Sequence, residues 1–329
     1  MDNMMTYEEF TEKIRKSLEG YFDDGSSVRL CNVKKNNGIE KCGVSLFSNK
    51  CNLSPTVYLE EYYSRYEQGE VPAQIIHEII TIFEDNRNKG NFDISFFTEF
   101  DSVSDRIMCK LINSEMNEEL LSMVPHIRYM DLAVVFFYLF PDDDAQKTFG
   151  RPDIDSRASI LIYQSHLELW GKNLEDLKKA AYENTQKLSN PDMIKMDDLM
   201  LSLLERRGSY TDCENLLDLE DTKLPREMVF YDQVMPQMFI LTNRQRQYGA
   251  TVMLYEGILK KVADKIGSGY YVIPSSVHEV ILVPDSPETS VGFLKNMVRE
   301  VNRTELARTE VLSDSVYYYN PLVDELSVC

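Results

Sequence analysis

The chain has 329 residues, of which 43% are hydrophobic, and this is enough for one large domain or two ordinary ones with a packed core. Asp+Glu 54 against Lys+Arg 35 gives a formal net charge of −19, which is spread over both halves of the chain. So negative a surface repels phosphate backbones and anionic headgroups, and the basic clusters are no longer than pairs, so nucleic-acid and membrane-surface roles are disfavoured.

The sequence also indicates a compartment. Its first ten residues lack the basic region and apolar core of an export signal, and the longest apolar run, residues 132–140, is too short to cross a bilayer. The cysteines show no C-x-x-C spacing, which argues against a zinc ribbon or a thioredoxin-type site. We therefore expect a cytoplasmic protein with reduced thiols.

Helices dominate the first hundred residues. Thr6 and Glu9 form a capping box at the start of the first helix, and Gly20 can take the left-handed conformation that ends one. Ser54, followed by a proline, is typical of another helix start. The predicted helices are residues 6–20, residues 54–69 and a helix from residue 72.

Between the first two helices, residues 28–47 predict a β-hairpin. The Asn-Gly pair at 37–38 favours a two-residue type I′ turn. That turn would place Cys31 opposite Val44 and put Cys42 on the same apolar face as Cys31. We interpret the two cysteines as small buried hydrophobic residues, not as a metal or redox site.

The alternation of strands and helices predicts an α+β fold with a mixed, largely antiparallel sheet and packed helices. A helix-rich N-terminal lobe that contains the β-hairpin is expected over residues 1–115, and a sheet lobe over 116–329, with a long surface connection near 206–226. The pattern predicts strands at 106–113, 126–140, 158–170, 238–242, 250–255, 270–273, 277–283 and 316–319, and helices at 174–188, 196–205, 256–267 and 287–302.

An acidic loop at residues 141–155 is a weak candidate for a metal site. Clustered carboxylates are the ligands that a hard cation prefers, but the loop lacks the register of a calcium-binding loop. We expect a solvated connection, and we expect no metal and no cofactor. The weak candidate ligands are Asp142, Asp144, Asp153 and Asp155.

Ser276 and His278 are the candidates for catalysis. They are two residues apart in a predicted strand and would point the same way, so that the imidazole could activate the hydroxyl. Glu279 would point to the opposite face and could not orient the ring, so a catalytic triad is locally incomplete. In the structural interpretation, which we favour, the two residues complete the hydrogen bonding at the end of a strand.

A short polar turn after the strand at 238–242 is the candidate binding site. Asn243, Arg244, Arg246 and Tyr248 make it locally cationic in an acidic chain, which suits an anionic ligand. The sequence contains no Walker loop, no G-x-G-x-x-G and no set of kinase motifs.

Six phrases together resemble a known family: SPTVYLEEYY (54–63), MDLAVV (130–135), SILIYQSHLELW (159–170), FILTN (239–243), YGA (248–250) and YYVIPSSVHEVILVP (270–284). The chain is similar to the domain-of-unknown-function family catalogued as five-six-eight-eight, which is found in anaerobic gut Firmicutes. The resemblance implies a bacterial intracellular protein with one architecture over its whole length. It implies no activity, cofactor or catalytic residue.

These observations favour a cytoplasmic, non-catalytic binding or regulatory module with a protein partner or a small ligand, and without nucleic acid or membrane. The alternative is a hydrolase that uses Ser276 and His278 in a pocket beside the turn at 243–248. A weaker alternative is an acidic inhibitor that imitates nucleic acid.

Overall fold

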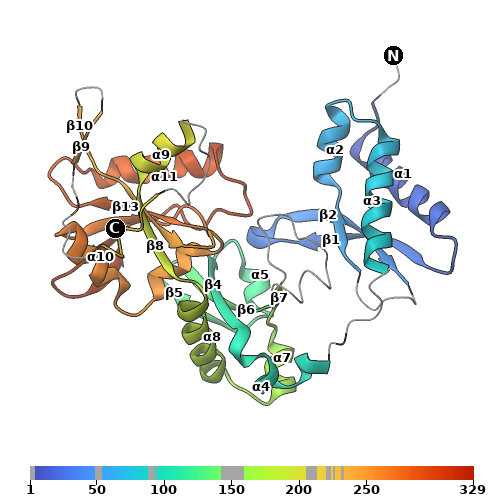
Figure 1. Cartoon of the computed structure of the whole chain (residues 1–329), viewed down its shortest axis with the longest axis horizontal. Coiled ribbons are helices and arrows are strands. Elements are labelled where there is room, and N and C mark those ends of the chain that lie inside the picture. The colour runs from blue at the N-terminus through green and yellow to red at the C-terminus, as the bar shows by residue number, and fades with distance from the viewer. Residues whose placement is uncertain are drawn as a thin grey trace. The chain divides into compact units, whose positions relative to one another are not determined.

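The chain forms two compact units, residues 1–99 with 139–159 and residues 100–138 with 160–329 (Figure 1). Both combine helices with antiparallel sheets, which confirms the predicted α+β class. Strand β4 (Ile107–Asn113) pairs along its whole length with β6 (Leu132–Leu139). The computed structural model describes residues 4–48, 54–87, 93, 95–141, 159–204, 213–219, 224, 227–230 and 233–329.

In the first unit, three helices cover one face of a three-stranded sheet of order β1-β2-β3 (Figure 1). The predicted capping box of Thr6 and Glu9 begins the first helix. Side chains such as Phe10, Ile79 and Phe83 are fully buried between the layers, and each such burial contributes about 1.5–3 kcal/mol. The elements are α1 (Tyr7–Tyr21), β1 (Ser27–Lys34), η1 (Asn36–Gly38), β2 (Glu40–Phe47), β3 (Thr56–Tyr58), α2 (Glu60–Glu67), α3 (Pro72–Arg87) and η2 (Ser95–Thr98).

The register of the hairpin differs from the prediction by one residue. Its loop contains the 3₁₀ turn η1, with Asn37 at a φ of 61°, and is longer than a two-residue turn. Cys31 therefore lies opposite Gly43. Because a shift of one residue moves a side chain to the other face, the predicted sharing of a face is wrong: Cys42 packs on the core, and the Cys31 thiol donates to the Gly43 carbonyl.

Two predicted helix ends are also wrong. The second helix begins at Glu60 and not at Ser54, because the residues between them form β3, which pairs with β2. The Ser54 hydroxyl accepts a hydrogen bond from the Leu46 N–H at 3.1 Å, so it joins the sheet and caps no helix. The first helix continues through Gly20 by one residue.

A six-stranded antiparallel sheet of order β15-β14-β12-β13-β11-β8 organises the second unit. Helices α9 and α11 lie together on one face of this sheet (Figure 1), where Leu199 meets Ile194 and Ile240, and Leu294 meets Val283. The strands are β8 (Pro191–Lys195), β11 (Phe239–Asn243), β12 (Tyr270–Ile273), β13 (Val280–Pro284), β14 (Tyr317–Asn320) and β15 (Glu325–Val328).

A smaller sheet of order β4-β6-β5, with β7 also paired to β6, completes this unit. Helix α8 packs against β4 through Thr185, whose hydroxyl accepts the Cys109 N–H at 2.9 Å. The remaining elements are α4 (Phe100–Val103), η3 (Ser104–Arg106), α5 (Glu118–Leu121), β5 (His126–Tyr129), β7 (Ser159–Leu161), α7 (Gln164–Trp170), α8 (Leu174–Leu188), α9 (Met196–Leu204), β9 (Glu227–Phe230), β10 (Gln233–Pro236), η5 (Gly249–Leu254), α10 (Ile258–Ile266) and α11 (Val291–Thr304).

Asp131, in the turn between β5 and β6, connects the smaller sheet to the C-terminal segment. Its carboxylate accepts hydrogen bonds from the hydroxyls of Ser313, Ser315 and Tyr317. Burial, together with this carboxylate, raises the pKa of the Tyr317 phenol far above its usual value, so the phenol remains a hydrogen-bond donor at neutral pH. These three hydrogen bonds connect the β5–β6 turn to residues that lie 182 to 186 positions later in the sequence.

Three strand predictions in this unit are wrong. Residues 126–140 form the β5–β6 hairpin with Met130 at a φ of 54°, so they are two strands. The predicted strand 158–170 is described from residue 159 on, where only the short β7 precedes α7. Residues 250–254 belong to the 3₁₀ helix η5, which ends before Tyr255. Strands β8 and β15 were not among the predicted elements. The branched and aromatic side chains of these segments are buried by contacts with parts of the chain that are distant in sequence. Local strand propensity does not include such contacts.

Of the predicted surface connection at 206–226, the structure describes residues 213–219 and residue 224. Leu216, Leu217 and Leu224 are buried there. Asn215 accepts the Met193 N–H and donates to the Pro191 carbonyl, which ties the segment to β8. This part of the connection is therefore packed against the sheet.

Replacing Asp131 with alanine removes the shared acceptor of three hydroxyl groups. Hydrogen bonds to a charged group contribute about 1.5–3 kcal/mol each, and the losses overlap, so we expect the free energy of unfolding to fall by about 3–5 kcal/mol in urea denaturation. Asp105→Ala, at an exposed side chain of the same unit, is the control and should change it by less than about 0.5 kcal/mol. Similar losses for the two variants would contradict the role assigned to Asp131.

Candidate functional site

The polar turn at 243–248 and the segment that contains Ser276 and His278 meet at the end of β11. The ring of Tyr248 stacks on the imidazole of His278, with centroids 5.9 Å apart and planes 13° apart. The Tyr248 N–H donates to His278 Nδ1 at 3.4 Å. The turn at 243–248 and the segment before β13 thus form one continuous surface, and this is the candidate site.

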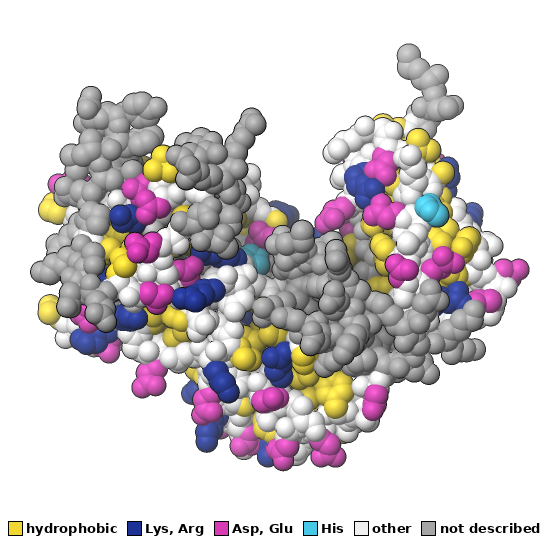
Figure 2. Space-filling model, viewed as in Figure 1, with side chains coloured by type: hydrophobic (Ala, Val, Ile, Leu, Met, Phe, Trp, Pro, Cys, Tyr) yellow, Lys and Arg dark blue, Asp and Glu magenta, His cyan; other side chains and the backbone are white. Residues whose placement is uncertain are grey.

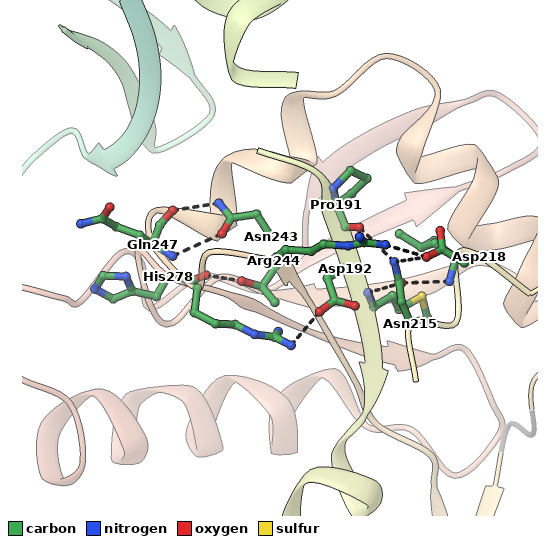
Figure 3. Close-up of polar contacts among 12 residues, drawn as sticks. Pro191, Asp192, Asn215, Asp218, Asn243, Arg244, Gln247 and His278 are labelled. Carbon is green, nitrogen blue, oxygen red and sulfur yellow. Dashed lines mark hydrogen bonds and ion pairs between the residues drawn. The ribbon is translucent and has the colours of Figure 1, made fainter. Parts of the chain in front are cut away.

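The side chain of Asn243 closes the turn upon itself. Its Oδ1 accepts the Gln247 N–H at 3.2 Å, and its Nδ2 donates to the Gln247 carbonyl at 2.8 Å, as Figure 3 shows. Asn243 is also almost fully buried. Both polar groups of the side chain are therefore used inside the protein, and the predicted role of Asn243 in gripping a ligand has no support in this geometry.

Gly249 allows the turn at 243–248 to come close to the residues before β13. The Thr242 hydroxyl donates to the His278 carbonyl at 2.8 Å, and Gly249 packs directly against this bond. A Cβ at Gly249 would lie 2.1 Å from Thr242 Oγ1 and 2.3 Å from the His278 carbonyl oxygen. Only glycine lets the backbone come so near.

The two arginines of the turn are each paired with an aspartate (Figure 3). Arg246 Nη2 lies 2.7 Å from Asp192 Oδ2, and both side chains are largely buried. Burial raises the pKa of Asp192, and the charges of the two arginines oppose that rise. Arg244 Nη2 lies 2.9 Å from Asp218 Oδ2, but these side chains are more than half exposed, so water and salt screen the pair. The charge of Arg246 is thus compensated within the protein, and that of Arg244 only weakly.

The structure separates the hydroxyl of Ser276 from the imidazole of His278. Strand β13 begins at Val280, so residues 276–279 precede it and strand alternation does not apply to them. Ser276 is 3% exposed, and its Oγ accepts the backbone N–H of His278 at 3.0 Å. The His278 ring instead faces Tyr248, and its Nε2 lies 4.0 Å from Glu310 Oε1.

Glu279 follows His278 at the entrance of β13. Burial raises the pKa of its carboxyl above the usual 4.5, the neighbouring His278 and Arg246 lower it, and Glu310 adds to the rise. The net shift is upward, so burial outweighs the two cations at this position.

Two further residues complete the surface, and sequence reasoning missed them. Lys110, on β4, places its Nζ 4.2 Å from the centroid of the Tyr248 ring, and Phe137, on β6, meets the same ring edge-on at 5.6 Å. Both lie more than a hundred residues before the turn in the sequence. The pairing of β4 with β6 brings the two side chains together, and no local motif predicts their contact with Tyr248.

The weak metal candidates Asp142, Asp144, Asp153 and Asp155 lie outside the described residues. In the part of the chain that the structure describes, no three His, Cys, Asp or Glu side chains are grouped closely enough to hold a metal ion. Among the same residues, no helix has both the length and the apolar character that a membrane span requires.

Charged side chains of opposite sign are interspersed on the face of the molecule seen in Figure 2. Lys and Arg alternate with Asp and Glu over the described parts of both units, and no extended row of carboxylates crosses this face. Imitation of nucleic acid would require such a row at phosphate-like spacing. The face in view therefore gives that weaker alternative no support.

The fold and these contacts define an α+β protein of two compact units, in which a glycine-dependent turn displays an aromatic ring beside an imidazole. The profile of a family described as Family of unknown function (DUF5688) matches residues 7–321. The chain belongs to this family, in agreement with the resemblance seen in the sequence. No curated protein and no solved structure matches the chain.

Gly249→Ala tests whether the turn depends on this close approach. The added Cβ meets a backbone carbonyl that cannot move without breaking the contact of the turn with His278, so we expect a loss of about 2–4 kcal/mol in the free energy of unfolding. Gly292→Ala is the matched control: its Cβ meets only Ser290 Oγ at 3.9 Å, and it lies in α11, where alanine is favoured. Thermal unfolding that ranks the two variants in the opposite order would refute this packing.

Proposed function

We propose that the chain is a cytoplasmic, non-catalytic binding or regulatory module. Its binding surface is the ring cluster, which we define as Lys110, Tyr248 and His278. This cluster takes an anionic group of a protein partner or of a small ligand. The observation that carries the proposal is the partly buried Tyr248 ring, which contacts both an ammonium and an imidazole.

The backbone under this ring supports a functional role. Tyr248 has a φ of 53° and Arg246 a φ of 54°, so two bulky residues of one short turn occupy the left-handed region. Each such residue costs on the order of 1 kcal/mol relative to glycine and persists where the surrounding structure holds it in place. Glycine at either position would give the same turn without strain. The side chains of Tyr248 and Arg246 are therefore the reason why these residues, and not glycine, occupy the turn.

The charge of Lys110 supports an anionic ligand. Within the described residues its ammonium contacts only aromatic rings, those of Tyr248 and Phe137, and no carboxylate. A cation that stacks on a ring retains its charge for a ligand, whereas Arg246 is already neutralised by Asp192. The His278 side chain beside it is about 30% exposed, so part of the ring is open to a ligand.

The non-catalytic part of the proposal is supported by the contacts of Ser276 and His278. A nucleophilic serine needs a base within hydrogen-bond reach of its hydroxyl. Ser276 instead accepts a backbone N–H, and the imidazole accepts the N–H of Tyr248. Both side chains have a structural task at the junction of turn and strand.

The cytoplasmic part is supported by the cysteines. In the described part of the chain, Cys31, Cys42, Cys109, Cys213 and Cys329 form no disulfide, as expected of a reducing compartment.

Lys110→Ala tests the binding surface. We expect species captured from a bacterial lysate by the immobilised wild-type protein to be retained at least about tenfold less by this variant, because a desolvated charge contact is lost. Lys172→Ala removes a comparable ammonium, 5.0 Å above the Phe100 ring in the same unit, and should leave capture unchanged. Capture should also weaken with added salt. Equal capture by both variants would exclude the ring cluster as the binding surface.

A fluorophosphonate probe, which labels activated serines, separates this proposal from the hydrolase alternative. We expect no labelling of the folded wild-type protein, because no imidazole lies at the Ser276 hydroxyl to take its proton. A serine hydrolase in the same reaction verifies the probe. Labelling of the wild type that disappears in Ser276→Ala would overturn the non-catalytic assignment.

A further inference from the structure

The first unit has a surface of its own on the face of the β1-β2-β3 sheet that lies opposite its three helices (Figure 1). Val28, Val44 and Val57 point toward the helices and are buried, so the strand residues that alternate with them point to the other face. None of these alternating residues is Asp or Glu, although the chain carries a net charge of −19. This face therefore differs in charge from the rest of the protein.

Three cations lie on this face without a carboxylate partner. The Arg29 guanidinium carbon is 5.0 Å from the centroid of the Phe47 ring, which is 51% exposed. The ammonium groups of Lys35 and Lys41 are 3.9 and 5.9 Å from the centroid of the Tyr58 ring. Within the described residues, none of the three cations forms an ion pair. We call these three cations and two rings the cationic face.

The centre of the cationic face is neutral, and its polar groups are bonded internally. Ser45 is buried, and its Oγ lies 2.9 Å from Thr56 Oγ1. The Cys31 thiol donates to the Gly43 carbonyl. The groups that a partner can contact are therefore the cations and the rings. Arginine with an exposed aromatic ring is a combination that protein interfaces favour.

The spacing of the cations sets the size of the partner. Lys41 pairs with Val33, which is four residues from Arg29 along β1. At about 3.3 Å per residue this is roughly 13 Å, the length of an extended peptide of about four or five residues. The Debye length at physiological ionic strength is about 8 Å, so most of the negative charges elsewhere on the chain are screened at this face. The local cations thus determine which charge is attracted to it.

From these observations we infer that the cationic face docks an extended acidic segment of a protein partner, with carboxylates at Arg29 and at the pair of Lys35 and Lys41. Both rings already hold the protein's own cations. Binding of single-stranded nucleic acid depends instead on bases that stack on open ring faces, so the face suits carboxylates better. The inference concerns the first unit and does not rest on the ring cluster of the second.

The test uses the full-length chain carrying Lys110→Ala, so that the ring cluster does not contribute, and measures fluorescence anisotropy of labelled hexaglutamate. Hexaserine and hexathymidylate with the same label are the comparison probes. We expect hexaglutamate to bind with a Kd of up to roughly 1 mM at low salt, at least about tenfold more tightly than either comparison probe, and to weaken as salt is added. Absence of hexaglutamate binding in this range overturns the inference. Equal or tighter binding of hexathymidylate also overturns it and assigns the face to nucleic acid.

Variants of the same protein locate the site. Lys35→Gln with Lys41→Gln should weaken hexaglutamate binding about tenfold or more, because two charges that face the peptide are lost. Lys13→Gln with Lys16→Gln removes the same charge from exposed positions of α1, on the helical side of the sheet, and should change binding by less than about twofold.

Lys35→Arg with Lys41→Arg retains the charge and should retain binding, and thermal unfolding verifies that each variant is folded. Equal weakening by the two pairs of glutamine substitutions would mean nonspecific attraction and would overturn the assignment. Because Lys110 is replaced in all of these proteins, the outcome is independent of the capture experiment at the ring cluster.

Discussion

The second unit depends on one carboxylate with three hydroxyl donors. Asp131 lies in a tight turn of the smaller sheet, and Ser313, Ser315 and Tyr317 approach it from the far end of the chain. A half-buried carboxylate is costly to desolvate, and three charge-assisted hydrogen bonds offset that cost only if all three donors are in place. The bonds fix β14 beside the β5–β6 turn, and β14 in turn pairs with β12 next to β13. The position of β13 determines where His278 enters the surface.

A second constraint acts at the turn after β11. Backbone atoms meet side chains closely enough at Gly249 that any Cβ would collide, and the residue before it is forced into the left-handed region. The turn is thus over-determined by Asn243, Gln247 and Thr242, all of which use their polar groups on the protein itself. Several polar residues that are candidates for function in the sequence therefore make their hydrogen bonds within the protein and maintain the shape of the turn. The ring of Tyr248 is the group of this turn that is left to contact a ligand.

The sequence predicts the helices of this protein better than its strands, for physical reasons. Helix α8 follows from an apolar stripe with its cap within one segment, and Thr6 with Glu9 signals the start of α1 in the same local way. The β5–β6 turn carries no Gly or Pro although Met130 takes a positive φ there, and the bonds that Asp131 makes to residues 313–317 lie outside any short window. The site follows the same rule. Tyr248 and His278 were both candidates, but Lys110 reaches them only through sheet pairing.

The ring cluster lies where β4 meets the turn before η5. Lys110 contacts Tyr248, while its neighbour Cys109 packs against Thr185 of α8, because successive residues of β4 face opposite ways. The turn that displays Tyr248 leads directly into η5, whose residues from Gly249 to Met253 are buried. Lys110 and Tyr248 are therefore each attached to backbone that is packed on its other side, which restricts how far the ammonium and the ring can move relative to one another.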